Sequence, residues 1–213
     1  MDSIIISYKN NLLSSLLQVD RVAVRKLVVE AKEQFSLGTV IEELISPVMT
    51  NIGDQWATGT VSLSQLYMSG RLVEDLLVTL FPSTEIQFKK HPPIASAVLL
   101  DFHVLGKRIV DNSMRVAGYK VQDFGSGITV DKLVQQTIEN DIEVLLLSVL
   151  MLPSAFRVGD VKAKLQEAGK DVKICVGGAP FRFDKNLWKE VNADVMGESA
   201  TDAVAIVQKL LKG

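Results

Sequence analysis

An Asp-x-His-x-x-Gly stretch near the middle of the chain carries residue types that could do chemistry. Asp101, His103 and Gly106 lie in "LLDFHVLGKRIV", directly after an apolar run. A neutral imidazole can ligate a metal or carry a proton. A histidine after a strand is also often a hydrogen-bonded surface or cap residue, and the aspartate can simply end the strand. The histidine alone does not distinguish these interpretations, so the residues around it have to be considered.

The small number of soft ligands limits the metal chemistry. The chain has one cysteine and two histidines, too few for a structural zinc site. A metal held in a macrocycle is different, because the ring supplies the equatorial ligands and the protein adds one axial imidazole. The single Cys175 excludes an internal disulfide, and its apolar surroundings predict a buried structural thiol.

Other cofactor motifs are absent or incomplete. "GSG" at 125–127 resembles part of a dinucleotide loop, but Val130 stands at the position of the third glycine. The sequence contains neither a P-loop nor a Gly-x-Ser-x-Gly elbow. A nicotinamide site is therefore not expected.

Composition narrows the class of protein. The 213 residues are 47% hydrophobic and 23% charged, which is typical of a globular protein. A net charge of -2 argues against a nucleic-acid partner. The longest apolar run, 144–152, is too short to span a membrane, and the N-terminus does not look like a signal peptide. We expect a cytoplasmic protein with neither a membrane nor a nucleic-acid partner.

The pattern of apolar residues divides the chain. Up to residue 81 the spacing is helical, and a stretch rich in proline and charge at 82–93 predicts a linker. We expect four helices in the first domain, residues 1–81, near 3–18, 20–36, 39–57 and 62–80.

From residue 94 to 213, short apolar runs alternate with amphipathic segments. Five strand–helix units of this kind predict a doubly wound, flavodoxin-like sheet of five parallel strands, so the whole fold is α + α/β. Gly118 and Gly169 are placed like helix C-caps. The expected strands are 94–100, 120–124, 144–150, 172–176 and 193–196, with helices at 106–118 and 157–169 between them.

In a sheet of this kind, ligands bind beyond the carboxyl ends of the strands, where the strand order reverses. His103 follows the first predicted strand, Ser148 lies in the third, and Gly177 and Gly178 follow the fourth. The glycine pair could equally serve only to permit a tight turn.

The order and spacing of these residues resemble the cobalamin-binding domain. Asp101-x-His103-x-x-Gly106 is followed after residues 107–147 by Ser148-x-Leu150, and after residues 151–176 by Gly177 and Gly178. The same arrangement is found in methionine synthase, cobalamin-dependent mutases and corrinoid methyl carriers. Residues 44–77 also resemble the helical cap that precedes this domain, so the likeness covers nearly the whole chain.

This resemblance implies a role for each site residue. His103 is expected to replace the nucleotide base of cobalamin as the lower axial ligand of cobalt, the base-off/His-on form. Asp101 would accept a hydrogen bond from its other ring nitrogen. Ser154, six residues after Ser148, corresponds to the third member of the Asp-His-Ser relay. The remaining residues would admit the nucleotide tail or let the corrin approach the backbone: Gly106, Ser148, Leu150, Gly177 and Gly178.

The resemblance also implies a shuttle. The chain would carry a methyl group from a donor-specific methyltransferase to an acceptor methyltransferase and would depend on a reductive activator. The helical cap, a four-helix bundle, would cover the upper face of the corrin. Candidates for that covering surface are Trp56, Leu66, Tyr67 and Met68, although these side chains could instead form the core of the bundle.

Two positions depart from the methyl carriers. These usually have glycine before the aspartate and a second aspartate after the histidine, where this chain has Leu100 and Val104. We expect fewer polar contacts around the lower face as a result.

Three other functions are alternatives to a methyl carrier: a cobalamin-dependent regulator, a mutase small subunit or a receiver-like module without cobalamin. The regulators have Glu-His where this chain has Leu66 and Tyr67.

Overall fold

The computed structural model describes residues 2–80, 88–199 and 202–211. The chain divides into two compact units, residues 1–83 and 84–213, and each is described by itself. Of the predicted linker, residues 82–87 lie outside the described part of the chain. Residues 88–93 lead directly into the first strand.

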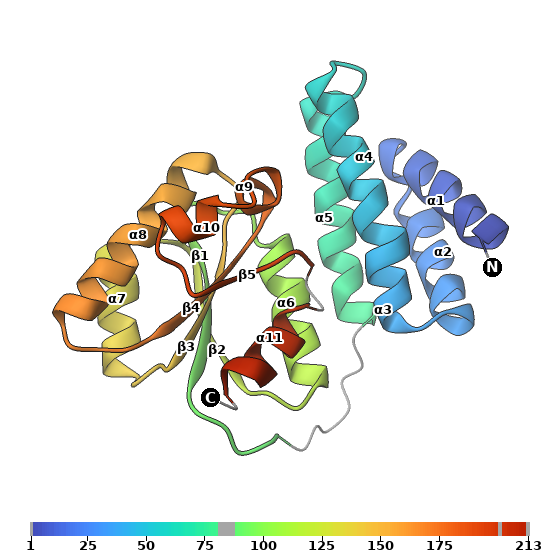
Figure 1. Cartoon of the computed structure of the whole chain (residues 1–213). Helices are drawn as coiled ribbons and strands as arrows, with labels where there is room; N and C mark the ends of the chain where they lie inside the picture. The colour runs from blue at the N-terminus through green and yellow to red at the C-terminus, as the bar shows by residue number, and fades with distance from the viewer. Residues whose placement is uncertain (1, 81–87, 200–201, 212–213) are drawn as a thin grey trace. The chain divides into compact units, whose positions relative to one another are not determined.

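The described residues 2–80 of the first unit form helices joined by short turns, and the four predicted helices are confirmed. One of them is a continuous run of three segments, in which the π-helical η1 precedes Pro47. The wider turn of a π-helix accommodates the proline, which cannot donate a backbone N–H to the helix. The elements are α1 (Asp2–Leu17), α2 (Arg21–Gln34), α3 (Leu37–Thr39), η1 (Val40–Ile45), α4 (Ser46–Ala57) and α5 (Leu63–Leu80) (Figure 1).

The second unit is a sheet of five parallel strands in the order β2-β1-β3-β4-β5. This is the predicted doubly wound, flavodoxin-like topology, and the order reverses between β1 and β3. The strands are β1 (Ile94–Leu99), β2 (Val121–Ile128), β3 (Val144–Ser148), β4 (Lys173–Gly177) and β5 (Val195–Gly197).

Helices cover both faces of the sheet (Figure 1). α6 (Leu105–Val116) and α11 (Asp202–Leu210) pack on one face, and α7 (Val130–Glu139) and α8 (Leu152–Glu167) pack on the other. Two short helices, α9 (Ala179–Phe183) and α10 (Leu187–Glu190), connect β4 to β5. Gly118 and Gly169 have positive φ after α6 and α8, as expected for helix caps.

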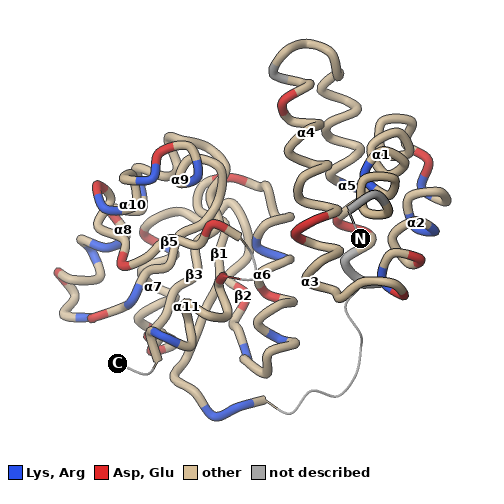
Figure 2. Tube along the Cα trace, turned by 45° about the vertical axis from the view of Figure 1, so that its right-hand side comes forward, with Lys and Arg blue, Asp and Glu red and all other residues tan. Residues whose placement is uncertain are grey.

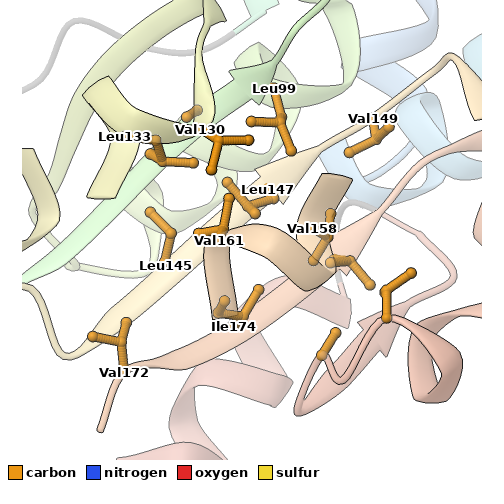
Figure 3. Packing of buried hydrophobic residues seen from close by; sticks show 14 of the residues in the cluster. Leu99, Val130, Leu133, Leu145, Leu147, Val149, Val158, Val161, Val172 and Ile174 are labelled. Carbon is orange, nitrogen blue, oxygen red and sulfur yellow. The ribbon is translucent and has the colours of Figure 1, made fainter. Parts of the chain in front are cut away.

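Alternate residues of the central strands supply the two cores. Ala97, Leu99, Leu145 and Leu147 point toward α7 and α8, into the larger cluster drawn in Figure 3. The opposite face of the sheet carries a smaller cluster that includes Cys175. β1 and β3 contain no charged residue (Figure 2), as expected for strands that are covered on both faces.

None of the described helices is both long and apolar enough to cross a bilayer.

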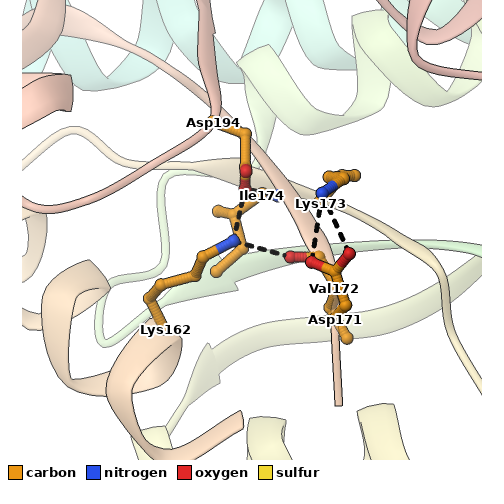
Figure 4. A network of polar contacts seen from close by, with 6 residues as sticks. All are labelled: Lys162, Asp171, Val172, Lys173, Ile174 and Asp194. Carbon is orange, nitrogen blue, oxygen red and sulfur yellow. Dashed lines mark hydrogen bonds and ion pairs between the residues drawn. The ribbon is translucent and has the colours of Figure 1, made fainter. Parts of the chain in front are cut away.

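A buried ion pair ties α8 to β4 and to the segment before β5 (Figure 4). The Nζ of Lys162 donates to Asp194 Oδ2 at 2.6 Å and to the carbonyl of Val172 at 2.9 Å. The same carboxylate oxygen accepts the backbone N–H of Ile174 at 2.7 Å. A lysine side chain that is only 10% exposed is tolerated here because Asp194 and the Val172 carbonyl both accept protons from its ammonium group.

Replacing Lys162 by methionine is expected to lower the free energy of unfolding by about 2 kcal/mol, because Asp194 then loses its counter-charge. The midpoint of urea unfolding measures the change. The exposed pair of Arg157 and Asp160, 2.8 Å apart, is a control, since Arg157→Met should cost less than about 1 kcal/mol. Equal losses in the two variants would contradict the prediction.

Candidate cofactor-binding site

Asp101 connects two loops at the carboxyl edge of the sheet. Its side chain is 6% exposed, and both carboxylate oxygens are used. Oδ1 accepts the backbone N–H of His103 at 3.0 Å, and Oδ2 accepts the backbone N–H of Leu150 at 3.1 Å. The loop after β1 is thereby fixed to the loop after β3, on the two strands between which the sheet order reverses.

His103 lies beside that carboxylate and faces solvent. Its Nδ1 is 3.4 Å from Asp101 Oδ1, and its side chain is 59% exposed. A carboxylate next to one ring nitrogen favours the tautomer that keeps the other nitrogen free as a ligand. The arrangement therefore suits a single axial ligand on an exposed edge.

Gly106 and Ser148 lie close together. A Cβ on Gly106 would lie 3.1 Å from Ser148 Oγ, which is tighter than most packing contacts. The glycine thus lets the first turn of α6 pack against the end of β3. This packing gives Gly106 a structural reason that is independent of any ligand.

The glycine pair after β4 has two different environments. Gly177 lies in register between Ser148 and Gly197, and a Cβ there would make only an ordinary contact. Gly178 has φ +124°, and its Cβ would lie 1.8 Å from the carbonyl oxygen of Val149. The close approach of two backbones thus requires glycine at position 178.

Ser154 is buried in the first turn of α8, which begins just after the Leu150 loop. Among the hydrogen bonds of the described residues, none joins Ser154 to Asp101 or His103. The relay through Ser154 therefore stays a prediction.

Leu100 has φ +57°, in the left-handed region where glycine is favoured. Leu100 therefore carries backbone strain that a glycine at this position would not have. Val104, the second departure, precedes α6 without any side-chain cap. The expectation of fewer polar contacts around the lower face stays a prediction.

Leu100→Gly is expected to raise the free energy of unfolding by about 1 kcal/mol, because glycine adopts a positive φ without steric cost. Urea unfolding of the apoprotein measures it. Val104→Gly, at a negative φ in the same loop, should not stabilise the protein. A Leu100→Gly variant no more stable than wild type would show that the leucine is not strained.

The "GSG" segment belongs to β2, which runs to Ile128 instead of ending at residue 124 as predicted. Gly125 and Gly127 have positive φ, and the pairing of β2 with β1 shifts register here. A Cβ on Gly127 would lie 2.3 Å from the ring of Phe102. The glycines therefore let an irregular strand end pass beneath the Asp-x-His loop.

Sequence reasoning missed Lys107 and Asp123. Lys107 follows Gly106 and is buried, and its Nζ lies 2.6 Å from Asp123 Oδ1 and 2.8 Å from Asp111 Oδ2. The residue spacing in α6 could have indicated that Lys107 is buried. Lys107 lies four residues before Asp111 and seven before Met114, so the three residues share one face of the helix, on which Lys107 and Met114 are buried.

On the helical unit, Trp56, Tyr67 and Met68 are exposed, and Leu66 is half-buried. A place in the bundle core is therefore excluded for the first three. Their role as a covering surface remains a prediction.

Cys175 is buried, as predicted, and desolvation raises the pKa of its thiol to about 12. The thiol therefore stays protonated at neutral pH and is a poor ligand. No group of three or more His, Cys, Asp or Glu side chains suited to a metal occurs in the described parts of the chain.

Comparison with known families gives two matches. A model described as a B12 binding domain matches residues 92–207, more than half of the chain. A second model with the same description matches residues 8–80.

Individual relatives agree. The trimethylamine corrinoid protein 2 of Methanosarcina mazei is 29% identical over 180 residues, which cover 81% of each chain. The structure of the monomethylamine corrinoid protein of Methanosarcina barkeri superposes with a TM-score of 0.86 at 23% identity, covering 96% of this chain and 98% of that one. The methanol:cobalamin methyltransferase complex of Methanosarcina barkeri matches with a TM-score of 0.55 at 19% identity, covering 97% of this chain and 80% of that one.

Proposed function

Because this chain belongs to the family of B12-binding-domain proteins, we propose that it is a corrinoid methyl carrier with His103 as the lower axial ligand of cobalt. Its cofactor is a cobalamin. The observation that carries the ligand assignment is the exposed imidazole of His103 beside the buried carboxylate of Asp101. The alternative of a receiver-like module without cobalamin is wrong, because the family model spans the motif.

The residues present fit a corrin. A metal that arrives in a macrocycle needs one protein ligand, and His103 is a single imidazole on an exposed edge. Gly177 adds no side chain at the end of β4, where it lies in register between Ser148 and Gly197. When bound, the cobalt supplies the nucleophile that accepts and releases the methyl group.

The protein's own part is to orient and tune the ligand. Asp101 holds its acceptor oxygen beside His103 Nδ1, which favours a proton on that nitrogen and leaves Nε2 free. The carboxylate cannot turn away easily, because the backbone N–H groups of His103 and Leu150 bind both of its oxygens. Ser154, buried at the start of α8, would be the third member of a proton relay with Asp101 and His103.

We further propose a donor-specific methyltransferase, an acceptor methyltransferase and a reductive activator as partners. The relatives above are named for trimethylamine, monomethylamine and methanol at 19–29% identity, so their likeness does not select a donor. Trp56, Tyr67 and Met68 are exposed on the helical unit, and a covering role for them stays a proposal.

The chain's two histidines allow a direct test. We would reconstitute apoprotein labelled with ¹⁵N-histidine with hydroxocobalamin, remove free corrin, reduce the cobalt to cobalt(II), and record electron paramagnetic resonance. Coupling to an axial ¹⁴N gives a triplet and coupling to ¹⁵N gives a doublet, so the label separates histidine from the nucleotide base. We expect a doublet.

The control is His91→Gln, which should keep the doublet, whereas His103→Ala should lose it. A labelled wild-type protein that still shows the triplet would mean that the nucleotide base remains on cobalt. A protein that elutes without corrin would contradict the carrier function itself.

A further inference from the structure

A buried ammonium lies one residue after the Asp-x-His-x-x-Gly motif. The side chain of Lys107 is 5% exposed, and its Nζ is 2.6 Å from Asp123 Oδ1 and 2.8 Å from Asp111 Oδ2. Removing a lysine charge from water is costly unless it is paired. The two carboxylates therefore fix where the first turns of α6 can lie.

Lys107 contacts Asp111 on its own helix and Asp123 on β2. Burial tends to raise the pKa of the Asp123 carboxyl, but hydrogen bonds from Lys107 and from the N–H of Gly125 outweigh it, and the pKa is lowered. Burial raises the pKa of Asp111 in spite of the same lysine. The ion pair thus joins α6 to β2.

The other end of the ligand loop is attached to the same strand. The N–H of Gly127 donates to the carbonyl of Asp101 at 2.7 Å, and the N–H of Leu100 donates to the carbonyl of Ile128 at 3.1 Å. The loop of residues 101–106, which contains His103, therefore has an attachment to β2 at each end. β2 is an edge strand whose pairing with β1 is irregular at this point.

We propose that Lys107 is a positioning residue for His103: by binding Asp123, it holds the ligand loop on β2 so that the imidazole is presented at one place. The cobalt part of this inference rests on the proposed function, but the ordering of the loop does not. If Lys107 acts this way, losing its charge should loosen residues 101–106 before it affects the rest of the domain.

The test compares two buried lysines of the same domain. Lys107→Met and Lys162→Met each remove an ammonium that lies 2.6 Å from an aspartate. The first variant is next to the loop, whereas the second breaks the α8 pair described above. Both should lower stability, so a difference between them reports position and not stability alone.

The first readout is amide hydrogen exchange of the apoprotein, followed on peptides that contain residues 101–106. Lys107→Met should exchange about tenfold faster there than wild type, and Lys162→Met should not. The second readout is the cobalt(II) resonance with ¹⁵N-histidine, in which the ratio of histidine-ligated to unligated cobalt should fall about tenfold in Lys107→Met only.

Two further variants keep the test informative if Lys107→Met folds poorly. Asp123→Asn removes the charge from a side chain that is 63% exposed, and it should reproduce both effects in weaker form. Lys107→Arg keeps the charge and should restore much of the loop protection.

Equal exchange of residues 101–106 in the Lys107 and Lys162 variants would overturn the proposal. The exchange result stands even if wild-type protein binds no corrin, because it is measured on the apoprotein. A failure of the proposed function is therefore distinguishable from a failure of this one.

Discussion

Asp101→Asn is expected to weaken cobalamin binding about 10- to 100-fold and to lower the free energy of unfolding of the apoprotein by about 1–3 kcal/mol. Both losses come from one side chain, because Asp101 accepts from two backbone N–H groups and lies beside His103 Nδ1. Asparagine has only one acceptor oxygen. Its NH₂ group must then face the N–H of either His103 or Leu150, and two donors cannot satisfy each other.

The loss of affinity has a separate cause. An ionised carboxylate makes the imidazole a better ligand by attracting the proton on its other nitrogen, and a neutral amide does so less. Retention of corrin after desalting, titrated against hydroxocobalamin, measures this effect. The midpoint of urea unfolding without corrin measures the loss of stability.

Asp184→Asn is the matched control. The Oδ1 of Asp184 accepts the backbone N–H of Asn186 at 2.9 Å, which is the same two-residue contact that Asp101 makes to His103, but on an exposed side chain. We expect its stability to stay within about 0.5 kcal/mol of wild type and its affinity to be unchanged. An Asp101→Asn variant indistinguishable from this control would remove Asp101 from the site.

The order of elements was predictable because helical and strand periodicities separate cleanly at residue 94. The end of β2 was not. Gly125 and Gly127 look like a loop in the sequence, yet pairing with β1 holds them in a bulged strand. Local preference was overridden here by a tertiary contact, since Gly127 donates to Asp101.

The candidate site residues were proposed from their spacing in the sequence, but their contacts could not be predicted from it. Asp101 bonds the amide of Leu150, 49 residues away in sequence, and such a pairing depends on which strands become neighbours. The ion pair of Lys107 with Asp123 likewise needs α6 to lie over β2. Leu100 was noticed as a departure in residue type, whereas its positive φ could be seen only in the folded backbone.

Gly178→Ala is expected to be the most destabilising single-methyl change considered, with a loss of more than about 3 kcal/mol or no folded protein. The added Cβ would lie 1.8 Å from the carbonyl oxygen of Val149, and φ +124° with ψ 178° is a conformation that is essentially restricted to glycine. Relief would require the loop after β3 or the loop after β4 to move. The first of these carries the N–H of Leu150 that binds Asp101.

Gly169→Ala separates the clash from the backbone strain. Gly169 also has a positive φ, +71°, but a Cβ there would meet nothing within 4 Å. Gly169→Ala should therefore lower the free energy of unfolding by only about 1 kcal/mol, which is the penalty for an alanine in the left-handed conformation. Thermal unfolding of both variants gives the comparison. Equal losses of stability in the two variants would mean that the backbones at Val149 and Gly178 can move apart at little cost. Glycine at position 178 would then not be needed to keep the two loops at the carboxyl edge together.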